Sequence, residues 1–430
     1  MGGVPGDVPG GIVRISCVGG GPAGLFLAVL MKLRDPAHEV TVYERRPEGS
    51  TYGWGVTYWA GLLESLERGD PVCAGAIREQ SVRWSDGTAF IHGGTTTHRG
   101  DEGFGIGRRE LLGILTERAR GLGVRVEFSH EVAPGAAELA GADLVVASDG
   151  VNSRLRSAWA EDFGPRLTRG RHMYAWLGTS KVFDSFTFAF EETEHGWVWC
   201  YGYKYSDERS TFVVECGPDT WRGLGLDRAG EAESLELLQR LFVKPLDGHA
   251  LLARPPAPDA AGQQAGVPWQ NFRTLSNRTW HRGNVVLLGD AAHTTHFSIG
   301  AGTTLALEDA LALADALDRA PGLSEALRHY ERSRRPAVLA AQSAARYSAR
   351  WFGNLPRYTR LPPEQMFALL GQRHSPLLPY VPPALYYRVD SAVNRSEALL
   401  RFKRWLGPRL GRALHRDGDG DGDGDEGRRS

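Results

Sequence analysis

A chain of 430 residues with 42% hydrophobic and 10% aromatic content is long enough for two folded domains and a further segment. Its formal net charge of -1 excludes a whole-protein field that would attract nucleic acid or an anionic membrane. No signal peptide is apparent, and the apolar stretch 24–31 ends at Lys32, far short of a membrane span. Four cysteines without metal-type spacing predict no metal site and buried free thiols in a cytosolic protein: Cys17, Cys73, Cys200 and Cys216.

Short apolar runs that end in Gly or Asp alternate with helical patterns along much of the chain. We expect strands at 12–18, 39–44, 142–148 and 284–288. Helices are expected at Arg108–Gly121 and at 303–317. Strands interspersed with helices predict an α/β fold with a Rossmann-like, parallel sheet in a ββα sandwich.

Between residues 173 and 215 the pattern changes to aromatic alternation. Every second residue from 197 to 205 is aromatic: Trp197, Trp199, Tyr201, Tyr203 and Tyr205. Another strand is expected at Ser210–Cys216. Period-two alternation over several strands predicts an antiparallel sheet with one covered face, inserted into the nucleotide-binding domain.

The expected boundaries follow from these patterns. The nucleotide-binding domain takes residues 1–75, 103–168 and 281–350, and the inserted sheet takes 76–102 and 169–280. A C-terminal helical segment takes 351–416, with a last helix at 391–406. The tail, 417–430, contains alternating Asp and Gly that cannot bury apolar surface, which predicts disorder.

A glycine-rich turn joins the first expected strand to a helix. It contains Gly19, Gly21, Pro22, Ala23 and Gly24. Such glycines permit a tight turn close to a pyrophosphate, and the helix N-terminus attracts the phosphates. Glu44, with Arg45 beside it, ends the second strand, where the carboxylate can bind ribose hydroxyls. The combination predicts a dinucleotide site but does not distinguish NAD from FAD.

Two further motifs, at 149–156 and 289–293, each follow an expected strand. Together with the glycine turn, they resemble the class A flavoprotein aromatic hydroxylases, typified by the p-hydroxybenzoate hydroxylase group. The resemblance covers the chain from Ile12 to about Arg335. It implies that the cofactor is FAD and that the inserted sheet is a substrate domain.

The resemblance also implies roles for individual residues. Asp290 is expected to bind the ribityl hydroxyls of FAD, and Arg108, with Arg109 as the alternative, to lie beside the ribityl-phosphate portion. Asp149 and Arg156 are expected near the pyrophosphate.

The segment 300–304 opens an expected helix and contains Gly300, Gly302 and Thr303. Its free N–H groups can face the flavin pyrimidine and stabilise the negative charge of the reduced ring. In the family resembled, NADH or NADPH binds transiently and reduces the flavin. Oxygen then reacts to give a C4a-hydroperoxide that hydroxylates an activated aromatic ring. A reductase on the same fold, without oxygen insertion, is the alternative of another class.

The segments 52–56 and 293–300 look like those of salicylyl-CoA 5-hydroxylases, 2-aminobenzoyl-CoA monooxygenases and the tryptophan hydroxylases of violacein biosynthesis. This favours an aryl thioester, such as an aminobenzoyl or hydroxybenzoyl group on coenzyme A or a carrier protein. A free indole or tryptophan is the alternative. Thr304 departs from the thioester pattern, in which a lysine stands there, so the identity of the carrier stays open.

Three side chains are candidates for the substrate side of the site. His296 is a candidate base or hydrogen-bond partner of a ring substituent, and a purely structural role is equally open. His293 is expected to be mainly structural. Trp54 lies between two glycines, where a Trp gains little from ordinary strand packing.

The expected last helix has a basic side that could steer a phosphate-bearing or carrier-bound substrate. Its basic residues are Arg395, Arg401, Lys403, Arg404, Arg409, Arg412 and Arg416. The alternative is that these basic side chains only face solvent and have no binding role. We expect a monomer or homodimer that binds neither nucleic acid nor membrane.

Overall fold

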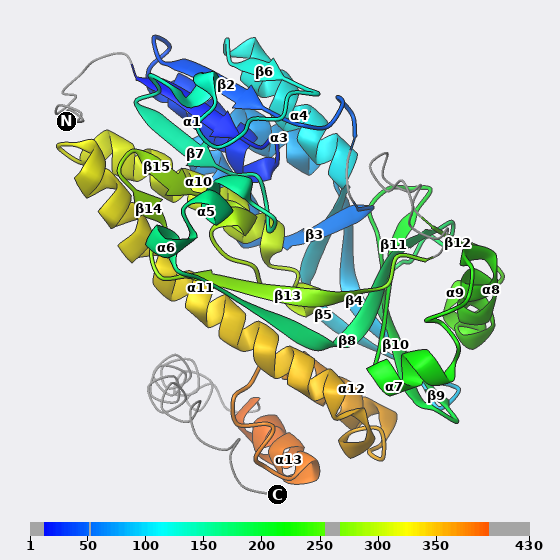
Figure 1. Cartoon of the computed structure of the whole chain (residues 1–430). Helices are drawn as coiled ribbons and strands as arrows, with labels where there is room; N and C mark the ends of the chain where they lie inside the picture. Colours follow the sequence, from blue (N-terminus) through cyan, green and yellow to red (C-terminus); the bar gives the residue numbers. More distant parts are fainter. Residues whose placement is uncertain (1–12, 51–52, 254–266, 395–430) are drawn as a thin grey trace, which may run out of the picture. The chain divides into compact units, whose positions relative to one another are not determined.

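The computed structural model describes residues 13–50, 53–253 and 267–394 (Figure 1). The chain divides into two compact units, Met1–Gln342 and Ser343–Ser430, whose boundary lies inside α11 (Leu323–Gly353). Tyr52, the basic residues 395–416 and the tail 417–430 lie outside the described residues. Among the described helices, none is long and apolar enough to cross a membrane.

The first unit contains a six-stranded sheet, parallel except for β14. Its order is β14 (His281–Arg282), β15 (Val285–Leu287), β7 (Leu144–Ala147), β1 (Arg14–Val18), β2 (Glu39–Tyr43) and β6 (Arg125–Glu127). The four strands predicted from apolar runs are β1, β2, β7 and β15, each confirmed with small shifts at the ends. Strands β7 and β15 are buried on both faces, which explains their continuous apolar sequences, whereas β2 alternates buried and partly exposed residues.

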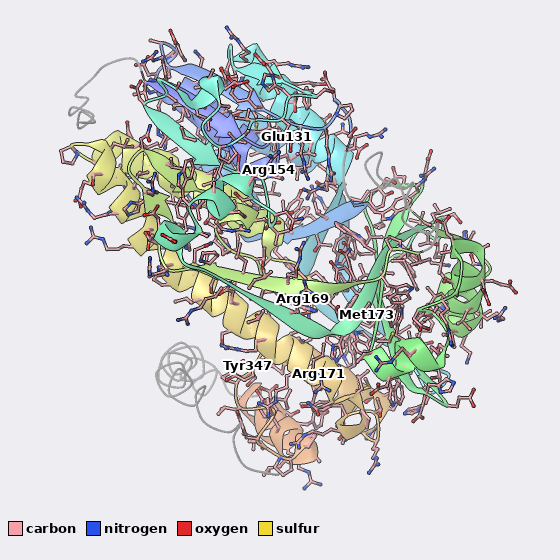
Figure 2. The ribbon with its side chains drawn as sticks, viewed as in Figure 1. Glu131, Arg154, Arg169, Arg171, Met173 and Tyr347 are labelled. Atoms are coloured by element: carbon pink, nitrogen blue, oxygen red, sulfur yellow. The ribbon has the colours of Figure 1, made fainter. Side chains whose placement is uncertain are left out.

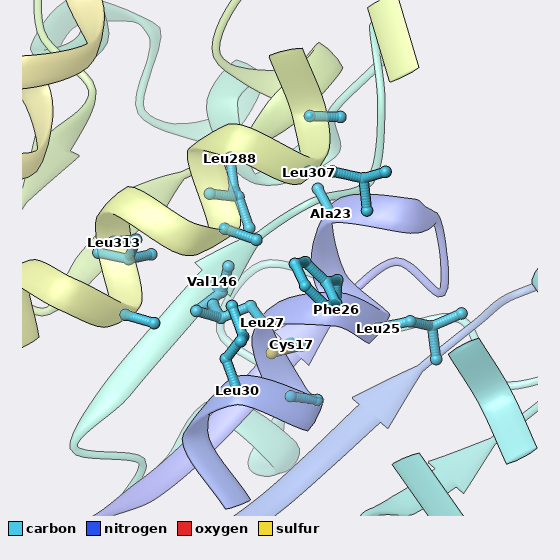
Figure 3. Close-up of a cluster of buried hydrophobic side chains, with 14 of the residues drawn as sticks. Cys17, Ala23, Leu25, Phe26, Leu27, Leu30, Val146, Leu288, Leu307 and Leu313 are labelled. Atoms are coloured by element: carbon cyan, nitrogen blue, oxygen red, sulfur yellow. The ribbon is translucent and has the colours of Figure 1, made fainter. Parts of the chain in front are cut away.

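Helices α1 (Pro22–Arg34), α4 (Arg108–Gly121) and α10 (Gly302–Arg319) pack into the core of this sheet. Figure 3 shows Phe26, Leu27 and Leu30 of α1 beside Val146 of β7 and Leu288 after β15. Helix α1 is apolar on nearly all sides, as a fully enclosed helix requires. Burial of each side chain of this size stabilises the folded state by about 1.5–3 kcal/mol, so helix α1 and the turn that precedes it are held firmly against the sheet.

A second sheet, of nine strands, confirms the predicted antiparallel sheet. Neighbouring strands are antiparallel, except that β4 runs parallel to β9. The path is β12 (Leu251–Leu252), β8 (Pro165–Thr179), β11 (Ser210–Cys216), β10 (Gly196–Lys204), β9 (Phe186–Thr193), β4 (Val82–Ile91), β5 (Gly94–Gly107) and β3 (Gly55–Trp59), and β13 (Gln270–Asn277) also pairs with β8. The expected domain boundaries stay predictions, although β3 joins this sheet from within the first expected range.

The second sheet differs from expectation at β10, where both faces are buried rather than one. Val198 and Cys200 belong to a core with Phe212 and Phe242. The aromatic residues of the opposite face are buried as well, because the segment after β15 packs on them and Phe297 lies 5.9 Å from Tyr201. The aromatic face is therefore turned toward the interior of the first unit.

Shorter helices complete the first unit. They are α2 (Ala60–Gly69), α3 (Pro71–Glu79), α5 (Arg154–Ala158), α6 (Ala160–Phe163), α7 (Pro218–Gly223), α8 (Glu231–Leu241) and α9 (Val243–Leu246). All four cysteines are free and buried, as predicted.

The second unit contains the end of α11, α12 (Pro363–Gly371) and α13 (Pro383–Asn394). The rings of Trp351 and Tyr358 stack within it at 4.7 Å. Helix α13 begins at Pro383, a residue well suited to the first turn of a helix. It includes residues 391–394 of the last helix expected at 391–406, whose remaining residues lie outside the described part of the chain.

Candidate functional site

The glycine turn between β1 and α1 needs its glycines for two different reasons. A Cβ atom at Gly19, whose φ is +112°, would lie 2.3 Å from the carbonyl oxygen of Ser148, and one at Gly24 would lie 2.4 Å from that of Gly19. These two positions let β1, β7 and α1 pack closely. At Gly21, the N-cap of α1, a Cβ would meet no atom within 4 Å. Open space therefore lies beside the helix N-terminus, where a phosphate can approach.

Glu44 is held by the backbone on both carboxylate oxygens. Its Oε2 accepts a hydrogen bond from the Gly20 N–H at 2.8 Å, and its Oε1 accepts one from the Arg46 N–H at 2.9 Å. Each carboxylate oxygen has a further lone pair, so the fixed group can still accept hydroxyl donors. The neighbouring Arg45 side chain is exposed.

Four charged groups from three segments of the chain surround one region beside this turn. Arg108 at the start of α4 interacts electrostatically with Asp290, Arg46 and Glu44. Burial lowers the pKa of Arg108 and raises the pKa of Asp290, and each partner opposes the effect on the other. Asp290 is enclosed by protein atoms while its side chain remains accessible to water, the environment of a group that lines a cavity.

Two buried polar atoms in this region have no hydrogen-bond partner among the described residues: Nε of Arg108 and Oδ1 of Asp149. The other oxygen of Asp149 accepts from the Arg154 N–H at 2.8 Å. Arg156 donates to the carbonyls of Val151, at 2.6 Å, and Ala291, at 3.0 Å, and so ties the turn after β7 to the segment that carries Asp290. Unpaired buried polar groups are rare and point to a missing ligand.

The side chain of His293 is enclosed by protein groups that it contacts directly. It is buried, and its Nε2 lies 2.7 Å from Oδ2 of Asp309, whose other oxygen accepts from Nε of Arg334 at 2.7 Å. The ring of Trp280 lies 5.1 Å away. These contacts anchor the segment after β15 to α10 and α11.

His296 lies three residues further on and faces the second sheet. Its Nδ1 accepts a hydrogen bond from the Ser298 N–H at 3.3 Å, and its Nε2 lies 3.7 Å from Oε1 of Glu215. Its ring stacks on Phe297, at 4.3 Å, and tilts against Phe272, at 4.9 Å. His296 thus connects the segment that carries Asp290 to the aromatic face of the second sheet.

Gly300 has a φ of +63°, and a Cβ there would lie 2.8 Å from Oγ1 of Thr57. A residue with a side chain would be strained there. Helix α10 then begins at Gly302, where a Cβ would meet nothing, and Thr303 is half-buried beside it. The first N–H groups of α10 have no partner within the helix and are available to a ligand.

Trp54 sits between glycines because other rings occupy the space of their side chains. A Cβ at Gly53, whose φ is +107°, would lie 2.3 Å from the ring of Trp176. A Cβ at Gly178 would lie 2.7 Å from the ring of Trp54 itself. The Nε1 of Trp54 is buried and has no hydrogen-bond partner among the described residues.

Glu215 on β11 was missed by the sequence reasoning. Its side chain is 1% exposed and lies on the aromatic face of the second sheet, within hydrogen-bonding distance of His172, Trp199 and Tyr201. The available signal was a carboxylate inside the apolar run Ser210–Cys216, since Glu is almost never fully buried without partners. Within residues 13–50, 53–253 and 267–394, no group of three or more His, Cys, Asp or Glu side chains could hold a metal ion.

Comparison with known proteins places these features in a family. Residues 250–345 match the model of an FAD binding domain. The chain is 39% identical to salicyloyl-CoA 5-hydroxylase of Streptomyces sp, over 81% of this chain and 67% of that protein. It is 37% identical to 3-hydroxy-4-methyl-anthranilyl-[aryl-carrier protein] 5-monooxygenase of Streptosporangium sibiricum, over 80% and 90%.

Protodeoxyviolaceinate monooxygenase of Chromobacterium violaceum is 30% identical over 89% of this chain and its own full length. The solved structure of 2-methyl-3-hydroxypyridine-5-carboxylic acid oxygenase superposes with a TM-score of 0.65 at 19% identity, over 81% of this chain and 92% of that one, and shows the same fold. The glycine turn, the acidic groups around it and these relatives lead to one conclusion: the chain belongs to the FAD-dependent aromatic monooxygenases.

Proposed function

We propose that this enzyme hydroxylates an aromatic ring that carries an amino or hydroxyl substituent and arrives as a thioester of coenzyme A or a carrier protein. NADH or NADPH would serve as reductant and O2 as co-substrate. The observation that carries the proposal is the identity of 37–39% with two enzymes whose names specify aryl groups on such carriers. An aryl thioester suits the second sheet, whose aromatic face is buried and excludes water.

The residues around the glycine turn fit FAD. Gly21 leaves space for the pyrophosphate at the N-terminus of α1, and Glu44 presents a fixed carboxylate to the ribose. Asp290 and the unpaired Nε of Arg108 would hold the ribityl portion. Asp149 and the N–H groups after Gly300 would complete the site. When bound and reduced, FAD supplies the oxygen chemistry, transferring one atom of O2 to the ring.

The protein's own task on the substrate side is to orient the ring. The buried donors that lack a hydrogen-bond partner among the described residues include Nε1 of Trp54 and Oγ1 of Thr295, which stands next to His296. Both suit a substrate carbonyl, because a donor that is unpaired without substrate gains a full hydrogen bond when substrate binds.

The test is a screen for oxygen-dependent NAD(P)H consumption and hydroxylated product. Salicyloyl and 2-aminobenzoyl groups would be offered on coenzyme A, on a carrier protein and as free acids. Product from a thioester, with weaker or no reaction of the free acid, is expected. Reaction with the free acids alone would contradict the thioester proposal. Tryptophan and indole belong in the same screen, because the protodeoxyviolaceinate enzyme matches over its full length.

Replacing Glu44 with Ala is expected to weaken FAD binding by about 10-fold while the protein remains folded. The change removes a charge-assisted hydrogen-bond acceptor, worth about 1.5–3 kcal/mol, from the adenosine side of the site. Flavin fluorescence titration of the apoprotein measures the dissociation constant. Glu48→Ala is the matched control, since Glu48 is exposed and pairs with Arg120. Release of FMN instead of FAD on denaturation would refute the role assigned to Glu44.

A tethered substrate also needs a docking surface. Arg166, Arg169 and Arg171 lie exposed along the first half of β8, and no acidic partner is found for them among the described residues (Figure 2 labels Arg169 and Arg171). The adjacent His172 reaches the aromatic face through Glu215. The row therefore suits the phosphates of coenzyme A or the acidic surface of a carrier protein.

Charge reversal at Arg169 and Arg171 is expected to raise the apparent KM for the thioester by about 10-fold, because electrostatic steering speeds association by at least that factor. Added salt should reproduce the effect, since exposed charges are screened over about 10 Å at 0.1 M ionic strength. The KM values for NAD(P)H and for the free acid serve as controls and should not change. An unaltered thioester KM in the variant would show that the row is only solvated surface.

A further inference from the structure

Glu215 is a buried carboxylate that has no part in the FAD site. It lies on β11, opposite Trp199 on β10 and Tyr174 on β8. Its Oε2 accepts hydrogen bonds from Nε1 of Trp199 at 3.1 Å and from the hydroxyl of Tyr201 at 3.0 Å. Its Oε1 lies 3.0 Å from Nδ1 of His172. Three neighbours thus fix the carboxylate in one orientation.

The fourth neighbour of Glu215 is His296, from the segment that also carries Asp290. Its Nε2 lies 3.7 Å from Oε1 of Glu215. Because the Ser298 N–H donates to Nδ1, the proton of the neutral ring belongs on Nε2, the nitrogen that faces the carboxylate. The bond from Ser298 is long, at 3.3 Å, so Nδ1 is only weakly occupied.

The charge states agree with this geometry. Burial acts to raise the pKa of Glu215, but the hydrogen bond from His172 and the proximity of His296 outweigh it, so the pKa lies below its ordinary value. Burial lowers the pKa of His296, and Glu215 opposes that shift. Near neutral pH the pair is therefore a carboxylate beside a neutral imidazole, the arrangement that orients a general base.

We propose that Glu215 is a positioning residue that keeps the proton of His296 on Nε2, so that Nδ1 can take a proton from the hydroxyl or amino substituent of the substrate. The proposal rests on the proposed function. For a hydroxyl substituent, the O–H bond breaks and an N–H bond forms at Nδ1, so the electron pair left on the oxygen enriches the ring for attack on the transferred oxygen. For an amino substituent, the lone pair activates the ring, and the N–H bond breaks as the attack turns the nitrogen into an iminium. When the ring becomes aromatic again, the hydrogen of the attacked carbon leaves as a proton to solvent and the imidazolium returns its proton to the substituent. Glu215 balances the imidazolium charge in between.

Glu215→Gln tests this step because it keeps the shape of the side chain and removes its charge. The kcat for hydroxylation is expected to fall by about 100-fold, the lower range for loss of general-base catalysis, with little change in KM. Flavin reduction and FAD content should be retained. Glu191→Gln is the matched control, because Glu191 is a half-buried carboxylate of the same sheet. It lies on the face opposite to Glu215, since its cross-strand neighbour Val198 belongs to the core on that face.

The pH dependence distinguishes a base from a merely structural contact. Hydroxylation requires neutral His296, so the rate rises with pH through the pKa of His296. Loss of the Glu215 anion lowers that pKa, and the midpoint should move to lower pH by about one unit. The groups that act on His296 are Glu215 and His172, with the Tyr201 hydroxyl on the far oxygen of Glu215.

A second readout does not depend on turnover. Titration of the His296 ring followed by NMR, assigned with a His296→Asn sample, should show a lower midpoint in Glu215→Gln and no change in Glu191→Gln. Glu215→Asp retains the charge at a greater distance and should give intermediate kcat and midpoint values, which keeps the test usable if the Gln variant does not fold.

Unchanged His296 titration or full hydroxylation in both Glu215 variants would overturn the proposal. The NMR result stands even if no thioester is hydroxylated, so failure of the proposed function can be told apart from failure of this inference.

Discussion

Replacing Asp290 with Ala is expected to yield a folded protein that does not retain FAD. The substitution leaves the guanidinium of Arg108 buried without its acidic neighbour and removes an acceptor for the ribityl chain. Loss of a charge-assisted hydrogen bond to the ribityl chain costs about 1.5–3 kcal/mol, which corresponds to about 10- to 100-fold weaker binding. The effect should exceed that of Glu44→Ala, because the ribityl contacts also fix the ring system of the flavin.

The absorbance of bound flavin per protein measures this result, and circular dichroism checks the fold. Asp162→Ala is a suitable control, since Asp162 is exposed and pairs with Arg282 outside the site. An Asp290→Ala enzyme with unchanged flavin content and turnover would show that the ribityl chain is held elsewhere.

Replacing His296 with Ala is expected to preserve FAD and the oxidation of NAD(P)H but to uncouple them from hydroxylation. Hydrogen peroxide should replace most of the hydroxylated product. Without His296 the substrate ring is not held in position, and its substituent has no base to accept a proton. An effect on the order of 100-fold on the hydroxylation rate is typical of such losses.

Product and peroxide are quantified per NAD(P)H consumed. The exposed His249, whose Nδ1 lies 3.2 Å from Oγ of Ser180, provides the matched control as His249→Ala. Full coupling in His296→Ala would mean that the contacts of this ring to Ser298 and Glu215 serve only to shape the segment.

Local sequence patterns predicted most of the first sheet. Helix α4 is recognisable because its apolar residues repeat at the helical period. Strand β7 is recognisable as a short continuous apolar run, as expected of a parallel strand buried on both faces. The turn at Gly19–Gly24 with Glu44 is also local, since its parts lie on adjacent strands and one helix. The assignment of FAD came from a family resemblance rather than from these periods.

The substrate side could not be predicted in the same way. The role of Glu215 depends on His172 and His296, which are brought to it by other strands and a loop, and no local pattern encodes that meeting. Likewise, Gly53 reads as a flexible position in the sequence, whereas in the fold it makes room for the ring of Trp176. Tertiary contacts determine which residue is needed at such a position. The aromatic alternation in β10 likewise predicts one covered face, whereas tertiary packing covers both faces.

The insertion of the second sheet has a consequence for biosynthesis. Strands β7 and β15 are neighbours, yet six strands of the second sheet, β8 to β13, separate Ala147 from Val285 in the chain. As the chain leaves the ribosome, β1, β2 and β7 can assemble early, but β7 keeps an open edge until β15 arrives, and open edges invite aggregation. Asp290, the proposed ribityl-binding residue, is thus synthesised after the strands of the second sheet. Nascent chains arrested before β15 should therefore bind chaperones more strongly than full-length chains.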